Sequence, residues 1–256
     1  MIGIAASAAD AQAGEAVGAS AAGVIARLVE AYPDALAGVE GGDLIWRDGT
    51  RMAISDGKLA KSAEERISAP SIGDMLGEVY PAGAPLVAPP VGADPGRARN
   101  AAFFVKLYGD CHKGGGVANL VDVVWLPSHG AKRVKMTARH GAAAHLAAVS
   151  AQLDKLPARF DAFLVPPAGS YICRVIAGTD RTSAHGYGIA IDVSLKHAHY
   201  WRWAKPDAGG ALTYHNEIPE EIVAAFEAEG FIWGGRWSHY DTMHFEYRPE
   251  LTGSAR

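Results

Sequence analysis

Two short segments of the chain carry histidine and aspartate in patterns that indicate a polar site on β-strands. In the first, a glycine-bounded loop with His185 leads into an alternating run, residues 188–195, that contains Asp192. If this run is a strand, Asp192 shares one face with glycine, alanine and serine, while aliphatic residues occupy the other face. A core strand does not need a carboxylate among small residues, whereas a metal site does, because small side chains let a ligand approach. His185 can then fold back beside Asp192.

The second segment also predicts a strand with a polar face. Along residues 243–247, apolar side chains alternate with His244 and Glu246. Asp241 stands three residues before His244, a spacing that lets its carboxylate reach a water on the metal without being a ligand. A single histidine on a strand is more often structural than a ligand. Two independent strands with polar faces make a metal site about as good an interpretation as a structural one.

Two histidines and one aspartate suit catalytic zinc, which usually has three protein ligands and one open position. Zinc lowers the pKa of its water and polarises a carbonyl group, and a nearby carboxylate can accept and return the proton. The expected chemistry is amide hydrolysis. The HExxH motif is absent from the sequence, which excludes a helical zincin site.

Composition excludes several other classes of function. The net charge of -4 over 256 residues gives no electrostatic reason to expect a nucleic-acid or anionic-membrane partner. No apolar run is long enough for a transmembrane helix, so no membrane span is expected. Nothing in the sequence indicates the oligomeric state. Residues 1–17 contain an Ala-Gln-Ala resembling a signal-peptidase site but no positive n-region, so they are either a signal remnant or an alanine-rich leader.

The only two cysteines, Cys111 and Cys173, permit one disulfide if the chain is exported. Two buried thiols are the alternative, and the spacing does not decide between them. Neither cysteine belongs to a CxxC pair, which argues against a zinc ribbon or a dithiol redox site.

Apolar periodicity and turn residues predict how the rest of the chain is organised. A helix is expected over residues 18–32 and a β-hairpin over 43–55, turning at Asp48 and Gly49. Together they form an N-terminal region, 18–80, and a proline-rich connector, 81–96, follows it. The main domain is expected over 97–252. Within it we expect helix or strand at 101–109 and 119–127, a strand at 134–139, and helices at 142–156 and 218–230.

The two polar segments resemble motifs of the zinc D-alanyl-D-alanine carboxypeptidase and L-alanyl-D-glutamate endopeptidase family. The first motif of that family, S-x-H-x-x-G-x-A-x-D, matches Ser183, His185, Gly188, Ala190 and Asp192 without a gap. The second, W-G-G followed by D-x-x-H-F, matches Trp233, Gly234, Gly235, Asp241, His244 and Phe245. The similarity extends over residues 97–252.

This resemblance implies a site and a fold. The implied metal is Zn²⁺ with ligands His185, Asp192 and His244, and the implied general base is Asp241. Of the two arginines that precede the first motif, Arg174 is the first candidate and Arg181 the second for binding substrate or the oxyanion, and a surface ion pair is the alternative for either. The implied fold is an α+β Hedgehog/DD-peptidase-like domain with a central antiparallel sheet and flanking helices.

The resemblance also implies a peptidoglycan or muropeptide substrate and a periplasmic or secreted location. The family's carboxypeptidases often have glutamate where this chain has Asp241, and aspartate beside W-G-G is closer to the endopeptidase branch. An L-Ala-D-Glu-type endopeptidase is therefore expected. The alternatives are a D-Ala-D-Ala carboxypeptidase and a non-catalytic cell-wall-binding module of the same fold.

Other histidines and tryptophans are expected to have structural roles. His197 and His199 suggest a solvated loop over aromatic side chains rather than a metal pair, and His239 is expected to be exposed. Core packing is the stronger interpretation for most of four tryptophans that could otherwise line a substrate groove: Trp201, Trp203, Trp233 and Trp237.

Overall fold

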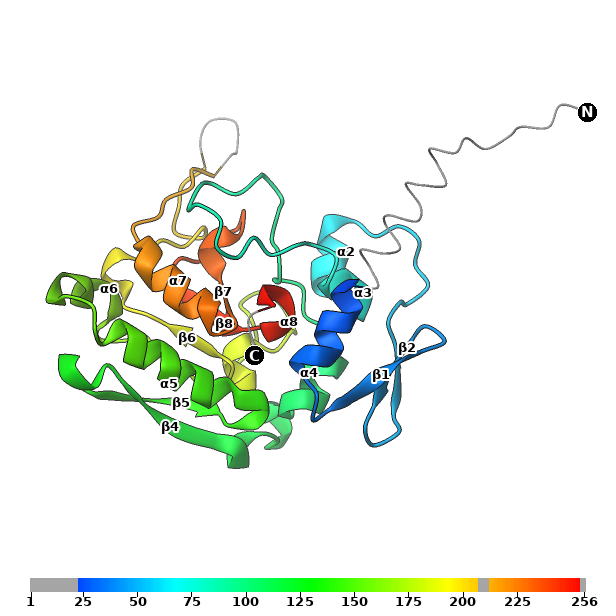
Figure 1. Ribbon diagram of the computed structural model, residues 1–256. Coiled ribbons are helices and arrows are strands. Elements are labelled where there is room, and N and C mark those ends of the chain that lie inside the picture. Colours follow the sequence, from blue (N-terminus) through cyan, green and yellow to red (C-terminus); the bar gives the residue numbers. More distant parts are fainter. Residues whose placement is uncertain (1–22, 207–211, 254–256) are drawn as a thin grey trace, which may run out of the picture.

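The computed structural model describes residues 23–206 and 212–253, which combine helices with three small antiparallel sheets (Figure 1). The α+β class expected from the sequence is therefore confirmed, and the specific Hedgehog-type fold stays a prediction. The strands are β1 (Leu36–Glu40), β2 (Asp43–Trp46), β3 (Arg51–Ala53), β4 (Leu120–Trp125), β5 (Lys132–Thr137), β6 (Ala190–Asp192), β7 (Phe231–Trp233) and β8 (His244–Tyr247). The sheet orders are β1-β2-β3, β4-β5 and β6-β8-β7.

Residues 23–31 are helical, and seven further α-helices follow along the described chain. They are α2 (Ala63–Ser68), α3 (Ile72–Met75), α4 (Ala101–Tyr108), α5 (Ala142–Leu153), α6 (Asp161–Leu164), α7 (Glu220–Ala228) and α8 (Pro249–Thr252). Most expected elements are confirmed: residues 101–109 contain a helix, 119–127 and 134–139 contain strands, and 142–156 and 218–230 contain helices. In this described part, no helix is long and apolar enough to cross a membrane.

The N-terminal region forms the expected hairpin between β2 and β3. The backbone NH of Trp46 donates to the carbonyl of Thr50, and Gly49 has a φ of +83°, which a tight turn of this kind requires. β1 adds a third strand to the hairpin. The part of the expected helix before residue 23, and the whole leader 1–17, lie outside the described residues.

The sheet β6-β8-β7 brings together the two segments singled out in the sequence. β6 and β8 are antiparallel, and their register places Asp192 directly opposite His244. Helix α7 packs against β7, and helices α5 and α7 contact each other over the sheets (Figure 1). The ring of Phe226 in α7 stacks on Phe245 in β8 with centroids 3.8 Å apart. The packing of Phe245 against α7 fixes the position of β8, and with it the position of His244 in the same strand.

The first strand is shorter than the sequence suggested. We expected residues 188–195, but β6 covers only Ala190–Asp192. Gly188 has a left-handed φ of +70° and ends a 3₁₀ turn, so it cannot continue the strand backwards. The Ser194 side chain accepts from the backbone NH of Lys196 and starts another 3₁₀ turn, which ends the strand forwards.

A continuous hydrophobic core runs from the N-terminal region into the rest of the molecule. Leu28 and Trp46 belong to the same buried cluster as Phe103 and Phe245. Residues 81–96, the expected connector, contain neither helix nor strand. The division of the chain into separate regions stays a prediction.

Cys111 and Cys173 form the disulfide that the sequence permitted. The bond closes a loop with a sequence separation of 62 residues, and constraint of the unfolded chain gives it a stabilising contribution of about 4 kcal/mol.

We expect the Cys111→Ser/Cys173→Ser double variant to unfold at a clearly lower urea concentration than the oxidised protein. Urea unfolding followed by tryptophan fluorescence measures this, with the reduced wild-type chain as control. Equal midpoints for all three proteins would contradict the stabilising role.

Candidate metal centre

His185 lies in a 3₁₀ turn, Ala184–Tyr187, immediately before β6, and its side chain is buried. Its Nδ1 lies 2.5 Å from the carbonyl oxygen of Ser170. A carbonyl only accepts hydrogen bonds, so the ring proton belongs on Nδ1 and the lone pair on Nε2. Nε2 lies 3.3 Å from Oδ1 of Asp192. The lone pair of His185 is therefore available on the side that faces Asp192.

The Ser170 carbonyl is held in place by the backbone beside β6. The backbone NH of Asp192 donates to the carbonyl of Gly169 at 2.8 Å, and the NH of Ala168 donates to the carbonyl of Asp192 at 2.8 Å. The Ser170 hydroxyl accepts from the backbone NH of Lys135 in β5. These bonds fix the segment that orients His185.

Asp192 is the common partner of both histidines. Its Oδ1 lies 2.9 Å from Nδ1 of His244, in addition to its contact with His185. Burial by itself raises the pKa of Asp192, but the hydrogen bonds and charges of His185 and His244 hold that pKa well below its usual range. Asp192 is therefore a carboxylate, which is the form that binds a cation.

His244 lies between two carboxylates. Its Nδ1 faces Asp192, and its Nε2 lies 3.0 Å from Oε1 of Glu246. Burial lowers the pKa of His244, but Asp192 and Glu246 outweigh it and raise the pKa to about 10. Carboxylates only accept hydrogen bonds, so each ring nitrogen of His244 carries a proton here. A cation on the Nδ1 side would replace the Nδ1 proton, while the Nε2 proton would stay hydrogen-bonded to Glu246.

The donor set fits a metal of the zinc type. One ligand atom from each of His185, Asp192 and His244 lies within 4.8 Å of the others. Two imidazole nitrogens and one carboxylate oxygen form a set that binds catalytic zinc, and each imidazole has an outer partner that fixes its tautomer. The three ligands predicted from the sequence are thus brought together from a turn, β6 and β8. A second group, Cys111, His112 and Cys173, is not available to a metal because its sulfurs form the disulfide.

Asp241 lies beside this cluster: its backbone carbonyl accepts from the backbone NH of His244 at 3.1 Å, while its carboxylate pairs with none of the three residues. Burial, opposed by the charge of His244 and reinforced by that of Asp192, raises the pKa of Asp241 to about 6. Its Oδ1 is buried and has no hydrogen-bond partner among the described residues. A carboxylate with an unused acceptor and a pKa near neutrality has the properties of a general base.

The W-G-G motif allows Asp241 to approach. Asp241 donates its backbone NH to the carbonyl of Gly234 at 3.0 Å. A Cβ atom on Gly234 would lie only 2.5 Å from the carbonyl oxygen of Asp241. Glycine is required here because the two backbones are in contact.

The two candidate arginines lie in different environments. Arg174 is exposed, whereas Arg181 is half-buried and its Nε has no partner among the described residues. Burial, with the neighbouring charges of Arg99 and Arg97, lowers the pKa of Arg181 to about 10. The sequence preferred Arg174. The surroundings of Arg181 make it an equally good candidate for binding a substrate group, because a buried guanidinium nitrogen without a partner needs an anionic or carbonyl acceptor.

Three groups around the site were missed in the sequence. Glu246 contacts His244, and its position two residues further along the same strand was a usable signal. The Ser170 carbonyl is a backbone group, for which side-chain patterns give no signal. Tyr200 pairs with Asp241 in an isolated β-bridge, and burial together with the Asp241 charge raises the pKa of its hydroxyl.

The remaining histidines and tryptophans mostly have the structural roles expected. Nδ1 of His197 and Nε2 of His199 each contact Glu217, at 2.7 and 2.8 Å. His239 is partly exposed but its Nδ1 also lies 2.7 Å from Asp94, a partner that the sequence did not suggest. Of the four tryptophans, Trp233 and Trp237 are buried, Trp201 is partly buried and Trp203 is 59% exposed.

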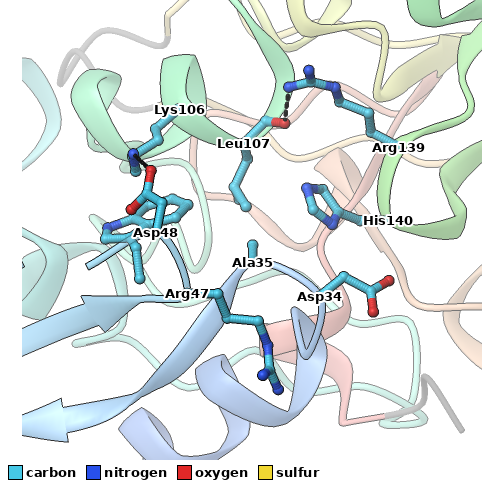
Figure 2. A pocket seen from close by; sticks show the side chains of 9 residues that line it. Asp34, Ala35, Arg47, Asp48, Lys106, Leu107, Arg139 and His140 are labelled. Carbon is cyan, nitrogen blue, oxygen red and sulfur yellow. Dashed lines mark hydrogen bonds and ion pairs between the residues drawn. The ribbon is translucent and has the colours of Figure 1, made fainter. Parts of the chain in front are cut away.

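A pocket between the N-terminal hairpin and α4 is separate from the metal cluster. Figure 2 shows Leu107 and His140 facing this space, with Lys106 paired to Asp48 at its edge. Arg139 donates to the carbonyl of Leu107, so its guanidinium is already engaged there. None of the predicted site residues lines this pocket.

Comparison with known proteins supports the resemblance seen in the two motifs. Residues 177–247 match the model of a family described as D-alanyl-D-alanine carboxypeptidase. This stretch contains His185, Asp192, Asp241 and His244. The match confirms the family resemblance over that stretch, and similarity over the wider range 97–252 stays a prediction. No curated protein and no solved structure gives a significant match to the chain.

Proposed function

We propose that this protein is a zinc-dependent peptidase that hydrolyses an amide bond in the stem peptides of peptidoglycan. The observation that carries the proposal is the cluster of His185, Asp192 and His244 beside Asp241, whose buried Oδ1 has no partner among the described residues. The family match over residues 177–247 supports the substrate class. A structural ion-pair cluster would not need a neighbouring carboxylate whose pKa is raised towards neutrality.

Each side chain has a distinct part in this reaction. His185, Asp192 and His244 hold the cation, which when bound would lower the pKa of a water and polarise the scissile carbonyl. Asp241 accepts the proton of the attacking water and returns it to the departing amine. The Trp233–Gly235 segment keeps the Asp241 backbone close, since a side chain on Gly234 would clash with it.

A guanidinium group would complete the site by binding the carbonyl oxygen or a carboxylate of the stem peptide. Arg174 and Arg181 both precede His185, and the buried Nε of Arg181 has no partner in the part of the chain that the structure describes. The charge of Arg174 acts on Tyr200, the residue bridged to Asp241. We propose that one or both arginines bind substrate in this way.

The bond cleaved is proposed to be of the L-Ala-D-Glu type. Aspartate at position 241, beside the W-G-G motif, is the feature that favours an endopeptidase. The description of the matching family favours the second candidate, a D-Ala-D-Ala carboxypeptidase. A non-catalytic wall-binding module is the third candidate, and the presence of three ligands together with a base argues against it.

Product analysis separates these three functions. The zinc-loaded protein is incubated with muropeptides that carry complete stem peptides, and the products are identified by mass spectrometry. We expect peptides beginning with D-Glu, and we expect no products when a chelator is present. Release of free D-alanine instead would overturn the endopeptidase proposal in favour of the carboxypeptidase. Intact muropeptides with zinc-loaded protein would favour the binding module.

The proposed location is the periplasm or the exterior of the cell. Peptidoglycan lies there, and a disulfide such as Cys111–Cys173 persists in an oxidising compartment. The leader that the sequence analysis compared with a signal remnant lies outside the described residues, so it gives no structural support.

A further inference from the structure

A line of buried charged side chains starts at His244 and leads away from the metal cluster. Glu246, Arg248 and Glu250 are 1%, 0% and 0% exposed. Burying a charge costs several kcal/mol unless a partner compensates for it, and a hydrophobic residue would fill the same space at lower cost. Three such residues in succession therefore indicate a function that requires charge at these positions.

The contacts along this line are continuous. Oε1 of Glu246 lies 3.0 Å from Nε2 of His244, and Nη1 of Arg248 lies 3.8 Å from Oε2 of Glu246. Nε of Arg248 donates to Oε1 of Glu250 at 2.5 Å. The hydroxyl of Tyr32 donates to Oε2 of Glu250 at 2.8 Å. Each carboxylate thus contacts one group on either side.

The far end of the line belongs to the N-terminal region. Tyr32 directly follows the helix 23–31, and Figure 1 shows this blue helix beside the red C-terminal helix α8, which contains Glu250. Tyr32 and Glu250 are separated by 218 positions in the sequence. The region that contains Tyr32 precedes the stretch that matches the family model. The N-terminal region is therefore connected to His244 through Glu250, Arg248 and Glu246, three residues that lie outside the two family motifs.

Two further groups from the segment before α4 fix the line from the side. Nη1 of Arg99 donates to Oε1 of Glu246 at 2.6 Å, the same oxygen that faces His244. Nη1 of Arg248 donates to the carbonyl of Gly96 at 2.6 Å. Gly96 has a φ of +81°, and a Cβ atom there would lie 2.6 Å from Ile232, so only glycine presents its carbonyl in this way.

We propose that Tyr32, Glu250, Arg248 and Glu246 form a positioning chain through which the N-terminal region orients His244 for metal binding. The chain acts through the Glu246 carboxylate, which accepts the Nε2 proton of His244 and leaves the Nδ1 lone pair on the side of Asp192. Glu246 keeps this orientation because Arg99 donates a hydrogen bond to its Oε1 and the charge of Arg248 lies 3.8 Å from its Oε2, which has no hydrogen-bond partner among the described residues. The inference rests on the proposed function only in taking His244 as a metal ligand.

The test measures metal binding rather than hydrolysis. Zinc affinity is determined by competition with a chromophoric chelator for wild type, Glu246→Gln and Tyr32→Phe. We expect zinc affinity to fall about 10- to 100-fold in Glu246→Gln, as for other outer partners of a ligating histidine. Tyr32→Phe loses the hydrogen bond donated to Glu250 and the longer one accepted from Tyr108, so the expected loss of zinc affinity is about three- to tenfold. The visible absorption bands of bound cobalt(II) should shift in Glu246→Gln.

Two control variants match these changes away from the centre. Glu229→Gln alters a carboxylate that lies 2.9 Å from His145, a histidine that is not a predicted ligand. Ser150→Ala removes a buried hydroxyl in α5 that donates to the carbonyl of Val124. Both controls should bind zinc as tightly as wild type and give the wild-type cobalt spectrum.

The outcome separates this inference from the proposed function. Equal zinc affinity for Tyr32→Phe and Ser150→Ala, or for Glu246→Gln and Glu229→Gln, would overturn the positioning chain even if wild type cleaves stem peptides. Tyr32→Phe removes only one oxygen atom, so it provides the test if Glu246→Gln fails to fold. Weakened zinc binding in the two chain variants alone would support the inference even if no stem peptide is cleaved.

Discussion

Replacing Asp241 by asparagine should lower the rate of stem-peptide hydrolysis by about 10²- to 10⁴-fold, the usual contribution of a general base. Asparagine keeps the size of the side chain but cannot accept a proton from water. Zinc content should stay at the wild-type level, because the only bond between Asp241 and a predicted ligand among the described residues is a backbone one, from the NH of His244 to the Asp241 carbonyl, which asparagine keeps. Single-turnover hydrolysis of a purified muropeptide, with zinc measured in the same sample, checks both expectations.

A matched control for this variant is Asp161→Asn. Oδ1 of Asp161 lies 2.7 Å from Nδ1 of His129, so this aspartate also neighbours a histidine, but it is not part of the predicted site. It should hydrolyse the substrate at the wild-type rate. Unaltered hydrolysis in Asp241→Asn would show that another group acts as the base.

The same residue sets the expected pH dependence. Burial raises the pKa of Asp241 to about 6, so the carboxylate that accepts the proton is increasingly protonated below that pH. The value of kcat/KM in the wild type should therefore fall as the pH drops below about 6. Residual hydrolysis by Asp241→Asn should lack this acidic limb.

Replacing His244 by alanine should remove the metal. The variant loses one of the three predicted ligands, so its zinc affinity should fall by more than the 10- to 100-fold typical of outer partners, and hydrolysis should fall with it. Chelator competition and elemental analysis of the dialysed protein measure the loss. His145→Ala is the matched control, because His145 also contacts a carboxylate, Glu229, but is not a predicted ligand.

A variant of a second predicted ligand, His185→Ala, tests the ligand set if His244→Ala does not fold. His244→Ala leaves the carboxylates of Asp192 and Glu246 without the imidazole that separates them, which destabilises the fold. His185→Ala removes a ligand from the loop before β6 and leaves His244 paired with both carboxylates. Wild-type zinc affinity in a folded His185→Ala protein would contradict the predicted ligand set.

Local elements of the fold could be predicted because their signals are local. The apolar spacing along residues 142–156 correctly indicated helix α5, and the start and stop residues Pro219 and Gly230 correctly indicated helix α7. The Asp48–Gly49 turn correctly indicated the hairpin of β2 and β3. The strand at 188–195 was predicted too long, because alternation of side chains does not reveal the left-handed backbone of Gly188.

The site could be predicted only in part. The alternation around Asp192 and His244 indicated polar faces, but the register that places them opposite each other depends on packing between segments 52 positions apart. The family resemblance supplied the ligand set. Neither source could predict the Ser170 carbonyl behind His185 or the contact between Tyr32 and Glu250, because these depend on tertiary structure.

The most direct test of the metal centre is a crystal structure of the zinc-loaded protein with diffraction data collected at the zinc absorption edge. We predict one anomalous peak bound by Nε2 of His185, Asp192 and Nδ1 of His244, at about 2.0–2.2 Å from each ligand atom. Oδ1 of Asp241 should face the same peak without binding it. An anomalous peak at His197 and His199, or no peak between His185 and His244, would contradict the zinc peptidase proposal.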